Sequence, residues 1–175
     1  MNYIRFREIS TKRLLLRQLE DTDDTAIFSL RSDNRVNQFL DRPKPNSIDE
    51  ARAFISKIIN GIAGGESLYW CIALKENKQL IGTICLWNLS ADRKTAELGY
   101  ELHPDHQGKG YMNEAMEAVI DFAFQTAGLS NLEACTHKDN EASGKLLLKH
   151  RFELQADRSD PGKVNHLFYT VSKPV

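Results

Sequence analysis

A strand, a proline stop, a glycine-rich turn and a helix start follow one another within residues 95–115, TAELGYELHPDHQGKGYMNEA. The apolar stretch 95–102 predicts a strand, and Pro104 ends it because proline cannot donate to a β-ladder. Gly108 and Gly110 form the turn, and helical spacing of apolar residues begins directly after it. A chain that passes from strand to helix in this way is typical of a mixed α/β domain.

The remaining apolar patterns predict strands and helices on both sides of this unit. Strands are predicted at residues 11–19, 68–74, 80–86, 132–136 and 168–171, and helices after the acidic segment 20–24, after Ser47, at 113–126 and at 143–149. Ser47 and Glu50 form a capping box, and Gly61, Gly64 and Gly65 are expected to end that helix. The order β-α-α-β-β-β-α-β-α-β predicts a mixed α/β layer fold. The length of 175 residues fits a single domain spanning residues 1–175.

Composition argues against several classes of protein. The net charge of −1 gives no overall field that would attract nucleic acid or an anionic membrane. No apolar stretch approaches the ~18 residues of a membrane span, and the first residues lack the apolar core of a signal peptide. Cys71, Cys85 and Cys135 are odd in number and lie in apolar runs, which is typical of buried thiols in a reducing compartment. We therefore expect a cytoplasmic protein that binds neither nucleic acid nor membrane.

The turn Gly108-Lys109-Gly110 has the properties of a phosphate site. Glycine lets the backbone approach a ligand closely and adopt positive φ. The first N–H groups of the following helix lack partners within the helix, and the helix dipole adds positive charge. The turn therefore predicts a pyrophosphate site with Lys109 nearby. The same tripeptide is also common in turns that bind nothing, and the stretch fits neither GxxxxGK[ST] nor the three-glycine dinucleotide pattern.

Five segments in a fixed order extend this evidence over nearly the whole chain. They are TKRLLLR at 11–17, LIGTI at 80–84, AELGYELHP at 96–104, QGKGYM at 107–112, and NEAS at 140–143 followed by Leu146, Leu147 and Phe152. The fourth segment resembles the [QR]-x-x-G-x-[GA] acetyl-CoA loop of the GNAT superfamily of N-acetyltransferases. The ordered set resembles the Rim-like branch of that superfamily, which includes enzymes that acetylate the N-termini of ribosomal proteins.

Two positions depart from the pattern of that branch. Met112 stands where many members have glycine or alanine, although only its backbone N–H would be needed. Arg151 stands where the branch usually has glycine before the phenylalanine. An arginine is less suited than glycine to the left-handed end of a helix.

The resemblance implies the GNAT-type acyl-CoA N-acyltransferase fold, a mixed sheet whose central parallel strands, 95–102 and 132–136, splay apart. Acetyl-CoA is the implied co-substrate, with its thioester in the gap and its pyrophosphate on the turn. The pantetheine arm would run beside residues 101–103, with Asn140 on the far side. The implied cofactor-binding residues are Leu102, His103, Gln107, Gly108, Lys109, Gly110, Tyr111, Met112 and Asn140.

The implied reaction is direct attack of a neutral amine on the thioester in a ternary complex, in which positioning supplies much of the acceleration. An alkyl amine with a pKa near 10 is only about 0.1% neutral at pH 7, a handicap of roughly 4 kcal/mol, so a base or a water wire is expected. Glu97 matches the carboxylate of the family strand, and Glu101 shares its face; both are equally compatible with solvated strand residues. Ser143 resembles the proton donor to the leaving thiolate, although a serine at a helix start is commonly a cap.

A metal site is a competing hypothesis, because His103 and His106 are three residues apart. Pro104 breaks any helix that would bring them onto one face, and no cysteine pair completes a ligand set. We therefore expect no metal. A cysteine nucleophile is also not expected, because all three cysteines lie in apolar runs.

The acceptor is left open by the sequence. A protein N-terminal α-amine and a small amine such as a polyamine or an antibiotic both fit, and a non-catalytic CoA-binding sensor is the alternative from another class. The acidic segment 20–24 either attracts a basic substrate or caps a helix. Four aromatic residues either line an acceptor pocket or pack in the core; they are Phe39, Phe54, Trp70 and Trp87. Both a monomer and a homodimer are compatible with the sequence.

Overall fold

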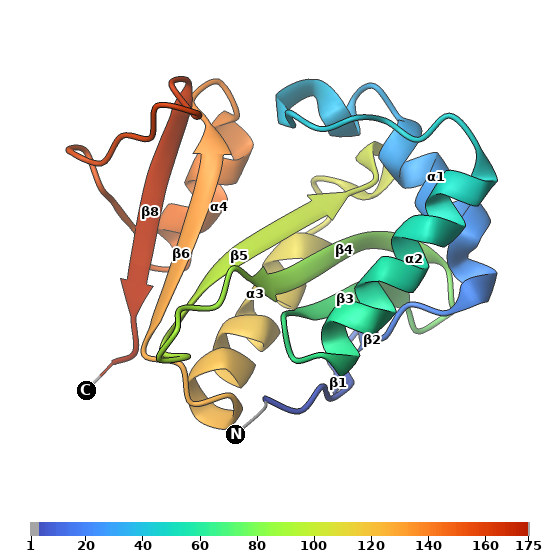
Figure 1. Cartoon of the computed structure of the whole chain (residues 1–175), viewed down its shortest axis with the longest axis horizontal. Coiled ribbons are helices and arrows are strands. Elements are labelled where there is room, and N and C mark those ends of the chain that lie inside the picture. Colours follow the sequence, from blue (N-terminus) through green and yellow to red (C-terminus); the bar gives the residue numbers. More distant parts are fainter. Residues whose placement is uncertain (1–3, 175) are drawn as a thin grey trace.

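Figure 1 shows one mixed sheet with helices on both of its faces. The computed structural model describes residues 4–174. The strand order is β1-β2-β3-β4-β5-β6-β8-β7, with β1 (Ile9–Ser10), β2 (Leu14–Arg17), β3 (Leu68–Leu74), β4 (Leu80–Trp87), β5 (Thr95–Leu102), β6 (Asn131–His137), β7 (Glu153–Leu154) and β8 (His166–Ser172). The helices are α1 (Asp24–Ser32), α2 (Ile48–Ala63), α3 (Tyr111–Asp121) and α4 (Glu141–Lys149), with short turns of helix η1 (Asp21–Asp23), η2 (Val36–Phe39), η3 (Pro104–His106) and η4 (Phe122–Thr126). The predicted mixed α/β fold is confirmed.

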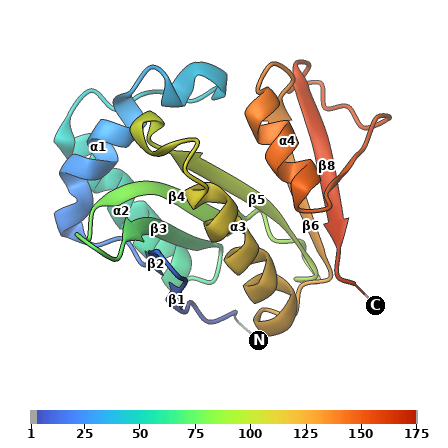
Figure 2. The ribbon, with the colours of Figure 1, turned by 180° about the vertical axis from the view of Figure 1, so that it is seen from behind.

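The alternation of side chains along the strands divides the core into two layers. In β3, Trp70 packs among residues of α3, whereas Tyr69 packs among residues of α1 and α2. Figure 1 shows α1 and α2 in front of the sheet, and Figure 2, seen from behind, shows α3 and α4 on the other face. Successive strand residues point to opposite faces, so in β5 Glu97 lies on the α1–α2 face and Tyr100 on the α3–α4 face.

The start of α2 follows the predicted capping chemistry. The Ser47 side chain accepts a hydrogen bond from the Glu50 backbone N–H (3.3 Å), and the Glu50 carboxylate accepts one from the Asn46 backbone (2.9 Å). The expectation that Gly61 ends the helix is wrong, because α2 continues to Ala63 and Gly64 is its C-cap. In the part of the chain from residue 4 to 174, no helix is long and apolar enough to cross a membrane.

The parallel strands β5 and β6 are paired only at their beginnings. Their ladder runs from Thr95↔Asn131 to Glu97↔Glu133, and beyond it β6 continues along β8 as far as His137. Figure 1 shows the two strands diverging from this point. The splayed central strands are confirmed.

Three local structures differ from the sequence prediction. The first predicted strand, 11–19, is shortened to β2, and the residues before it form the further short strand β1, which pairs with β2 as a hairpin. The helix predicted at 113–126 changes at Phe122 from the α-helix α3 to the π-helical turn η4. Arg151 adopts the left-handed region (φ +64°) although it is not glycine. The C-terminal end of α4 holds it there, because the Phe152 N–H donates to the Leu147 carbonyl (3.1 Å).

Gly82 in β4 is required by the close approach of β5. A Cβ atom at this position would lie well inside contact distance of the Glu101 backbone carbonyl and 2.9 Å from a Leu102 methyl group. We predict that Gly82→Ala lowers the free energy of unfolding by about 1–3 kcal/mol, measured by denaturant titration.

Gly61 supplies the matched control for this substitution. It lies inside α2, where an added Cβ meets nothing closer than 3.5 Å. Gly61→Ala should raise the stability by roughly 0.5–1 kcal/mol, because alanine is the better helix former. Equal effects of the two substitutions would contradict the packing described for Gly82.

Candidate functional site

The chain enters α3 through two glycines in the left-handed region, with φ +72° at Gly108 and +80° at Gly110. Gly110 is the N-cap of α3. Among the described residues, nothing accepts a hydrogen bond from the backbone N–H groups of residues 108–113; the first engaged N–H is that of Glu114, which donates to the Gly110 carbonyl (3.1 Å). Free N–H groups at a helix N-terminus attract an anion.

Side chains within the loop hold this turn against the end of β5. Gln107 Nε2 donates to the Leu102 carbonyl (3.0 Å), and Lys109 Nζ donates to the Asp105 carbonyl (2.8 Å). The predicted cofactor-binding residues Gln107 and Lys109 therefore have a structural role, since the side chain of each hydrogen-bonds to backbone that precedes the turn.

Arg13 is a second anchor, and sequence reasoning missed it. Its guanidinium donates to the Lys109 carbonyl (2.9 Å), pairs with Glu114 (2.7 Å) and lies 4.4 Å from the centre of the Tyr111 ring. Burial alone would raise the pKa of Glu114, but hydrogen bonds from Thr11 and Arg13 lower it below its ordinary value, so this carboxylate stays ionised. No local pattern could reveal the contact, because about a hundred residues separate its partners.

The backbone of β5 also presents groups to the gap, of which the Leu102 carbonyl already accepts from Gln107. The His103 N–H donates to the Ile81 carbonyl (2.8 Å). In the antiparallel pair of β4 and β5, the backbone groups of every second residue, counted back from His103, therefore point toward β4. The residues between them, Tyr100 and Leu102, direct their backbone groups toward the region where β6 has moved away. An extended ligand with amide groups can pair there as an added strand, and a diphosphate fits the free N–H groups of the turn.

A cavity of about 360 Å³ lies where β5 and β6 separate. Its walls come from the end of η2, β4, β5, β6, α4 and the loop before β8. The lining residues are Phe39, Leu40, Asp41, Trp87, Glu97, Leu98, Gly99, Tyr100, Cys135, Thr136, His137, Ser143, Gly162, Lys163 and His166. The structure thus brings together the two predicted catalytic residues, Glu97 and Ser143. Of the four aromatic candidates, Phe39 and Trp87 line the cavity, whereas Trp70 and Phe54 pack in the core.

The two carboxylates that sequence reasoning left open as bases have different surroundings. Glu101 is 7% exposed and contacts two arginines, Arg31 at 3.6 Å and Arg42 at 2.5 Å. Glu97 is 15% exposed, and its nearest polar partners are the Asn88 amide at 3.4 Å and the Lys163 ammonium at 3.9 Å. Glu101 is therefore committed to a buried ion pair, while Glu97 keeps its oxygens available to a ligand.

A pair of hydroxyl groups connects the two sides of the gap. The Tyr100 hydroxyl of β5 lies 2.6 Å from Ser143 Oγ of α4, and burial raises the pKa of Tyr100 to about 12. The cap of α4 is Asn140, whose Oδ1 accepts a hydrogen bond from the Ser143 N–H (3.2 Å), so the Ser143 hydroxyl is not the cap. Sequence reasoning missed Tyr100, although strand alternation places it on the face of α4.

The cysteines lack the properties of nucleophiles. Burial raises the pKa of Cys71 and of Cys85 to about 12, and it also raises the pKa of Cys135. These groups are thiols at neutral pH, and the thiolate is the reactive form. Cys85 and Cys135 differ from the expectation of burial, because both are only partly covered, and Cys135 also lines the cavity.

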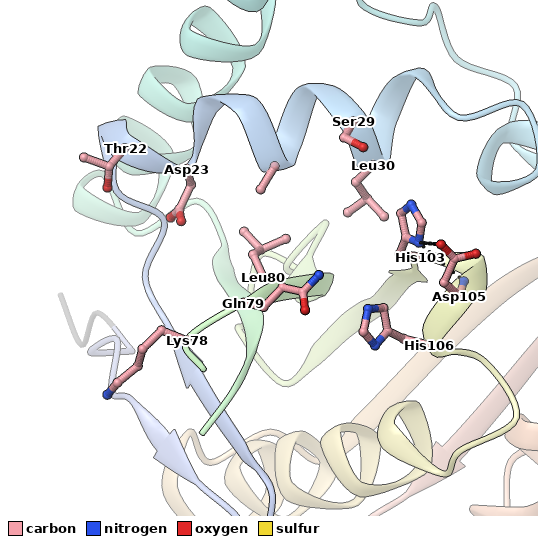
Figure 3. A pocket seen from close by; sticks show the side chains of 11 residues that line it. Thr22, Asp23, Ser29, Leu30, Lys78, Gln79, Leu80, His103, Asp105 and His106 are labelled. Atoms are coloured by element: carbon pink, nitrogen blue, oxygen red, sulfur yellow. Dashed lines mark hydrogen bonds and ion pairs between the residues drawn. The ribbon is translucent and has the colours of Figure 1, made fainter. Parts of the chain in front are cut away.

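Figure 3 shows a second hollow, of about 350 Å³, between α1, the turn after β3 and η3. The rings of His103 and His106 line it with their centres 6.1 Å apart, and His103 Nδ1 lies 3.6 Å from the Asp105 carboxylate. Throughout residues 4–174, no three His, Cys, Asp or Glu side chains form a group that could hold a metal ion. Both backbone groups of His103 are engaged within the chain, because its N–H donates to the Ile81 carbonyl (2.8 Å) and its carbonyl accepts from the His106 N–H (2.9 Å).

Comparison with known proteins identifies the family. The model of the acetyltransferase (GNAT) domain matches residues 13–153, which include the turn, both central strands and α4. The chain belongs to the GNAT acetyltransferase family. This GNAT domain is accordingly an acetyl-transferring enzyme.

Relatives of this GNAT acetyltransferase include enzymes that act on ribosomal proteins. The uncharacterized N-acetyltransferase YoaA of Bacillus subtilis (strain 168) is 35% identical over 148 residues, which cover 85% of this chain and 84% of YoaA. The ribosomal protein uS5-alanine N-acetyltransferase of Escherichia coli (strain K12) is 28% identical over 160 residues, covering 87% and 81% of the two chains. The structure of RimL, a ribosomal L7/L12 alpha-N-protein acetyltransferase in complex with coenzyme A, superposes with a TM-score of 0.83 at 20% identity and covers 95% of this chain and 98% of RimL.

The turn before α3 can be tested through ligand binding. Gly110→Val forces a β-branched residue into φ +80° and brings a Cβ to 3.3 Å from the Arg13 guanidinium. We predict that this variant loses the rise in melting temperature that acetyl-CoA produces in the parent protein, measured by differential scanning fluorimetry.

Gly128→Val is the matched control, because Gly128 has φ +73° and open space around it. Both substitutions should cost about 1–2 kcal/mol of stability through backbone strain. The control should keep its response to acetyl-CoA. If Gly110→Val responds as the control does, the turn does not hold the diphosphate.

Proposed function

We propose that this protein transfers an acetyl group from acetyl-CoA to a primary amine by direct attack in a ternary complex. One observation carries the proposal: a carboxylate and a hydroxyl pair line one cavity at the point where β5 and β6 separate. When bound, acetyl-CoA supplies the acetyl group as an activated thioester. The residues of the chain bind acetyl-CoA and orient the amine. They also assist the loss of a proton from the amine and stabilise the sulfur until it gains one.

The turn and the gap are proposed to bind the co-substrate. The backbone N–H groups of Gly108, Gly110, Tyr111 and Met112 hold the diphosphate, since they have no acceptor among the described residues. The backbone of β5 near Leu102 holds the pantetheine arm as an added strand. Two hydrogen bonds within the chain limit which groups of the predicted cofactor-binding residues are available. The Leu102 carbonyl already accepts from Gln107, and the Asn140 side-chain oxygen already caps α4. In the proposed complex Leu102 therefore offers its N–H, and Asn140 offers its amide NH₂.

Glu97 and Ser143 are proposed to act on either side of the reacting carbon. Glu97 accepts the proton that the amine loses as its nitrogen bonds to the acetyl carbon. The bond from that carbon to sulfur breaks with its electron pair remaining on sulfur, and Ser143 donates a hydrogen bond to that sulfur. The free thiol and the acetylated amine are the products. The presence of both Glu97 and Ser143 in one cavity favours an enzyme over a CoA-binding sensor.

The walls of the cavity favour an acceptor that presents one amine beside an apolar group. Leu40 and Trp87 line the cavity and are 39% and 44% exposed, so they form an apolar rim. Among the described lining residues, Asp41 and Glu97 are acidic and Lys163 is basic. A polyamine or an aminoglycoside would need several carboxylates, whereas a peptide N-terminus or a small monoamine needs one.

Acetyl-CoA should raise the melting temperature of the protein, because it binds only the folded state. With acetyl-CoA bound, a thiol-release assay against peptides with free N-termini, apolar monoamines, polyamines and aminoglycosides should show release with the first two classes. No thermal shift at millimolar acetyl-CoA would refute the proposal. Release with polyamines alone would refute the acceptor class and leave the reaction standing.

Glu97→Gln should lower kcat by roughly 100-fold, a usual contribution of a general base. The loss should be largest at low pH, because an amine with a pKa near 10 then binds as its ammonium, and Glu97 is needed to remove that proton as well. Glu133→Gln is the matched control, since Glu133 lies opposite Glu97 in the parallel ladder and its carboxylate pairs with Arg158. Equal rates for the parent and Glu97→Gln across pH would indicate that water, and not Glu97, accepts the proton of the amine.

A further inference from the structure

The contact between Tyr100 and Ser143 joins β5 to α4 across the gap, at a point where β5 no longer pairs with β6. Tyr100 lies beyond Glu97, where the ladder between β5 and β6 has ended. Ser143 lies in the first turn of α4, is 8% exposed and lines the same cavity as Tyr100. Their hydroxyl oxygens are 2.6 Å apart, which is a short distance for two neutral hydroxyls.

The chemistry of the two groups sets the direction of this hydrogen bond. A phenol is the stronger donor of the two and an aliphatic hydroxyl is the stronger acceptor, so Tyr100 donates and Ser143 Oγ accepts. Burial raises the pKa of Tyr100 to about 12, which keeps its proton in place at neutral pH. The Ser143 backbone is fixed by its N–H bond to Asn140. The hydrogen of the Ser143 hydroxyl is therefore free to point into the cavity.

We infer that Tyr100 is a positioning residue that turns the Ser143 hydroxyl toward the departing sulfur. The inference rests on the proposed function, in which the sulfur lies in this cavity. Tyr100 donates to Ser143, Ser143 donates to the sulfur, and the negative charge left on sulfur when its bond to carbon breaks is stabilised through both hydrogen bonds. Without Tyr100, the Ser143 hydroxyl is free to rotate away.

The pair acts as a hydrogen-bond donor and not as an acid that gives up its proton. A hydroxyl whose pKa is about 12 does not protonate a thiolate whose ordinary pKa is about 8.5. The proton that completes the thiol comes from water, and Glu97 passes the proton lost by the amine to the hydroxide that remains. Charge and protons balance over the reaction, and the two hydroxyls end in the state in which they began.

Other ionisable groups face the same space and affect any titration made there. They are Glu97 of β5, Cys135 and His137 of β6, Asp41 after η2, and Lys163 and His166 near the start of β8. Electrostatic interaction with Tyr169 of β8 also raises the pKa of Tyr100. Burial, with His137 and Lys163 nearby, lowers the pKa of His166, so that ring is neutral above the acidic range. The measurement must therefore compare variants that leave these groups unchanged.

The test is the ionisation of the coenzyme A thiol bound to the protein, followed by the ultraviolet absorbance of its thiolate as pH rises. This readout needs no acceptor and no turnover. In the parent protein the bound thiol should ionise below the pH at which free coenzyme A does. Tyr100→Phe and Ser143→Ala should each raise that pH by about one unit, the effect of losing one hydrogen bond to a charged sulfur.

A double variant separates a relay from two independent effects. If Tyr100 acts only through Ser143, Tyr100→Phe has no further effect in the Ser143→Ala background. Additive shifts would overturn the inference, as would a Tyr100→Phe protein whose bound thiol ionises as in the parent. Coenzyme A that does not bind at all would instead count against the proposed function, so the two failures are distinguishable.

Replacement of Tyr100 by 3-fluorotyrosine keeps the test decisive if Tyr100→Phe does not fold. The fluorinated phenol is a stronger donor and nearly the same size. It should lower the pH of ionisation of the bound thiol below that of the parent, the opposite of the phenylalanine variant. A change in the same direction as Tyr100→Phe, or none, would contradict the relay.

Discussion

β6 forms a long antiparallel ladder with β8 but keeps only a short parallel ladder with β5. The sheet therefore opens from within, at two strands that are neighbours in its order. Backbone groups of β5 that would bond to β6 in an unbroken sheet are left facing the gap, and such groups require a partner. The cavity, the predicted catalytic side chains and the N-terminal end of α4 all lie at this fork.

The charges around the fork make two carboxylates of one strand unequal. Arg31 from α1 and Arg42 from the segment after η2 both contact Glu101, which is enclosed on the α1–α2 face. Glu97 lies four residues nearer to the closed end of the fork, and its nearest polar partners are the Asn88 amide and the Lys163 ammonium. The α1–α2 side of the sheet therefore does more than cover the core, since its two arginines engage Glu101 and leave Glu97 as the carboxylate of β5 that lines the cavity.

The N-terminus of α3 is held by contacts from another part of the sheet. Arg13, just before β2, bonds to the Lys109 carbonyl and to Glu114 of the first turn of α3. These contacts fix the turn while its backbone N–H groups stay free. A rigid turn with free donors does not need to reorganise on binding a diphosphate, which is the advantage of a preorganised site.

The family resemblance suggested both cavity residues, Glu97 and Ser143. Local chemistry in the sequence predicted the order of the longer strands and helices along the chain, the turn at Gly108 and Gly110, and the start of α2 at Ser47. Those features depend on periodicity, φ preferences and caps, which are properties of neighbouring residues. The sequence did not predict Arg13, Tyr100 or the isolation of Glu97 from the two arginines. Only the tertiary structure decided these, because each is a contact between segments far apart in the chain, and such contacts exist only after the sheet has formed and opened.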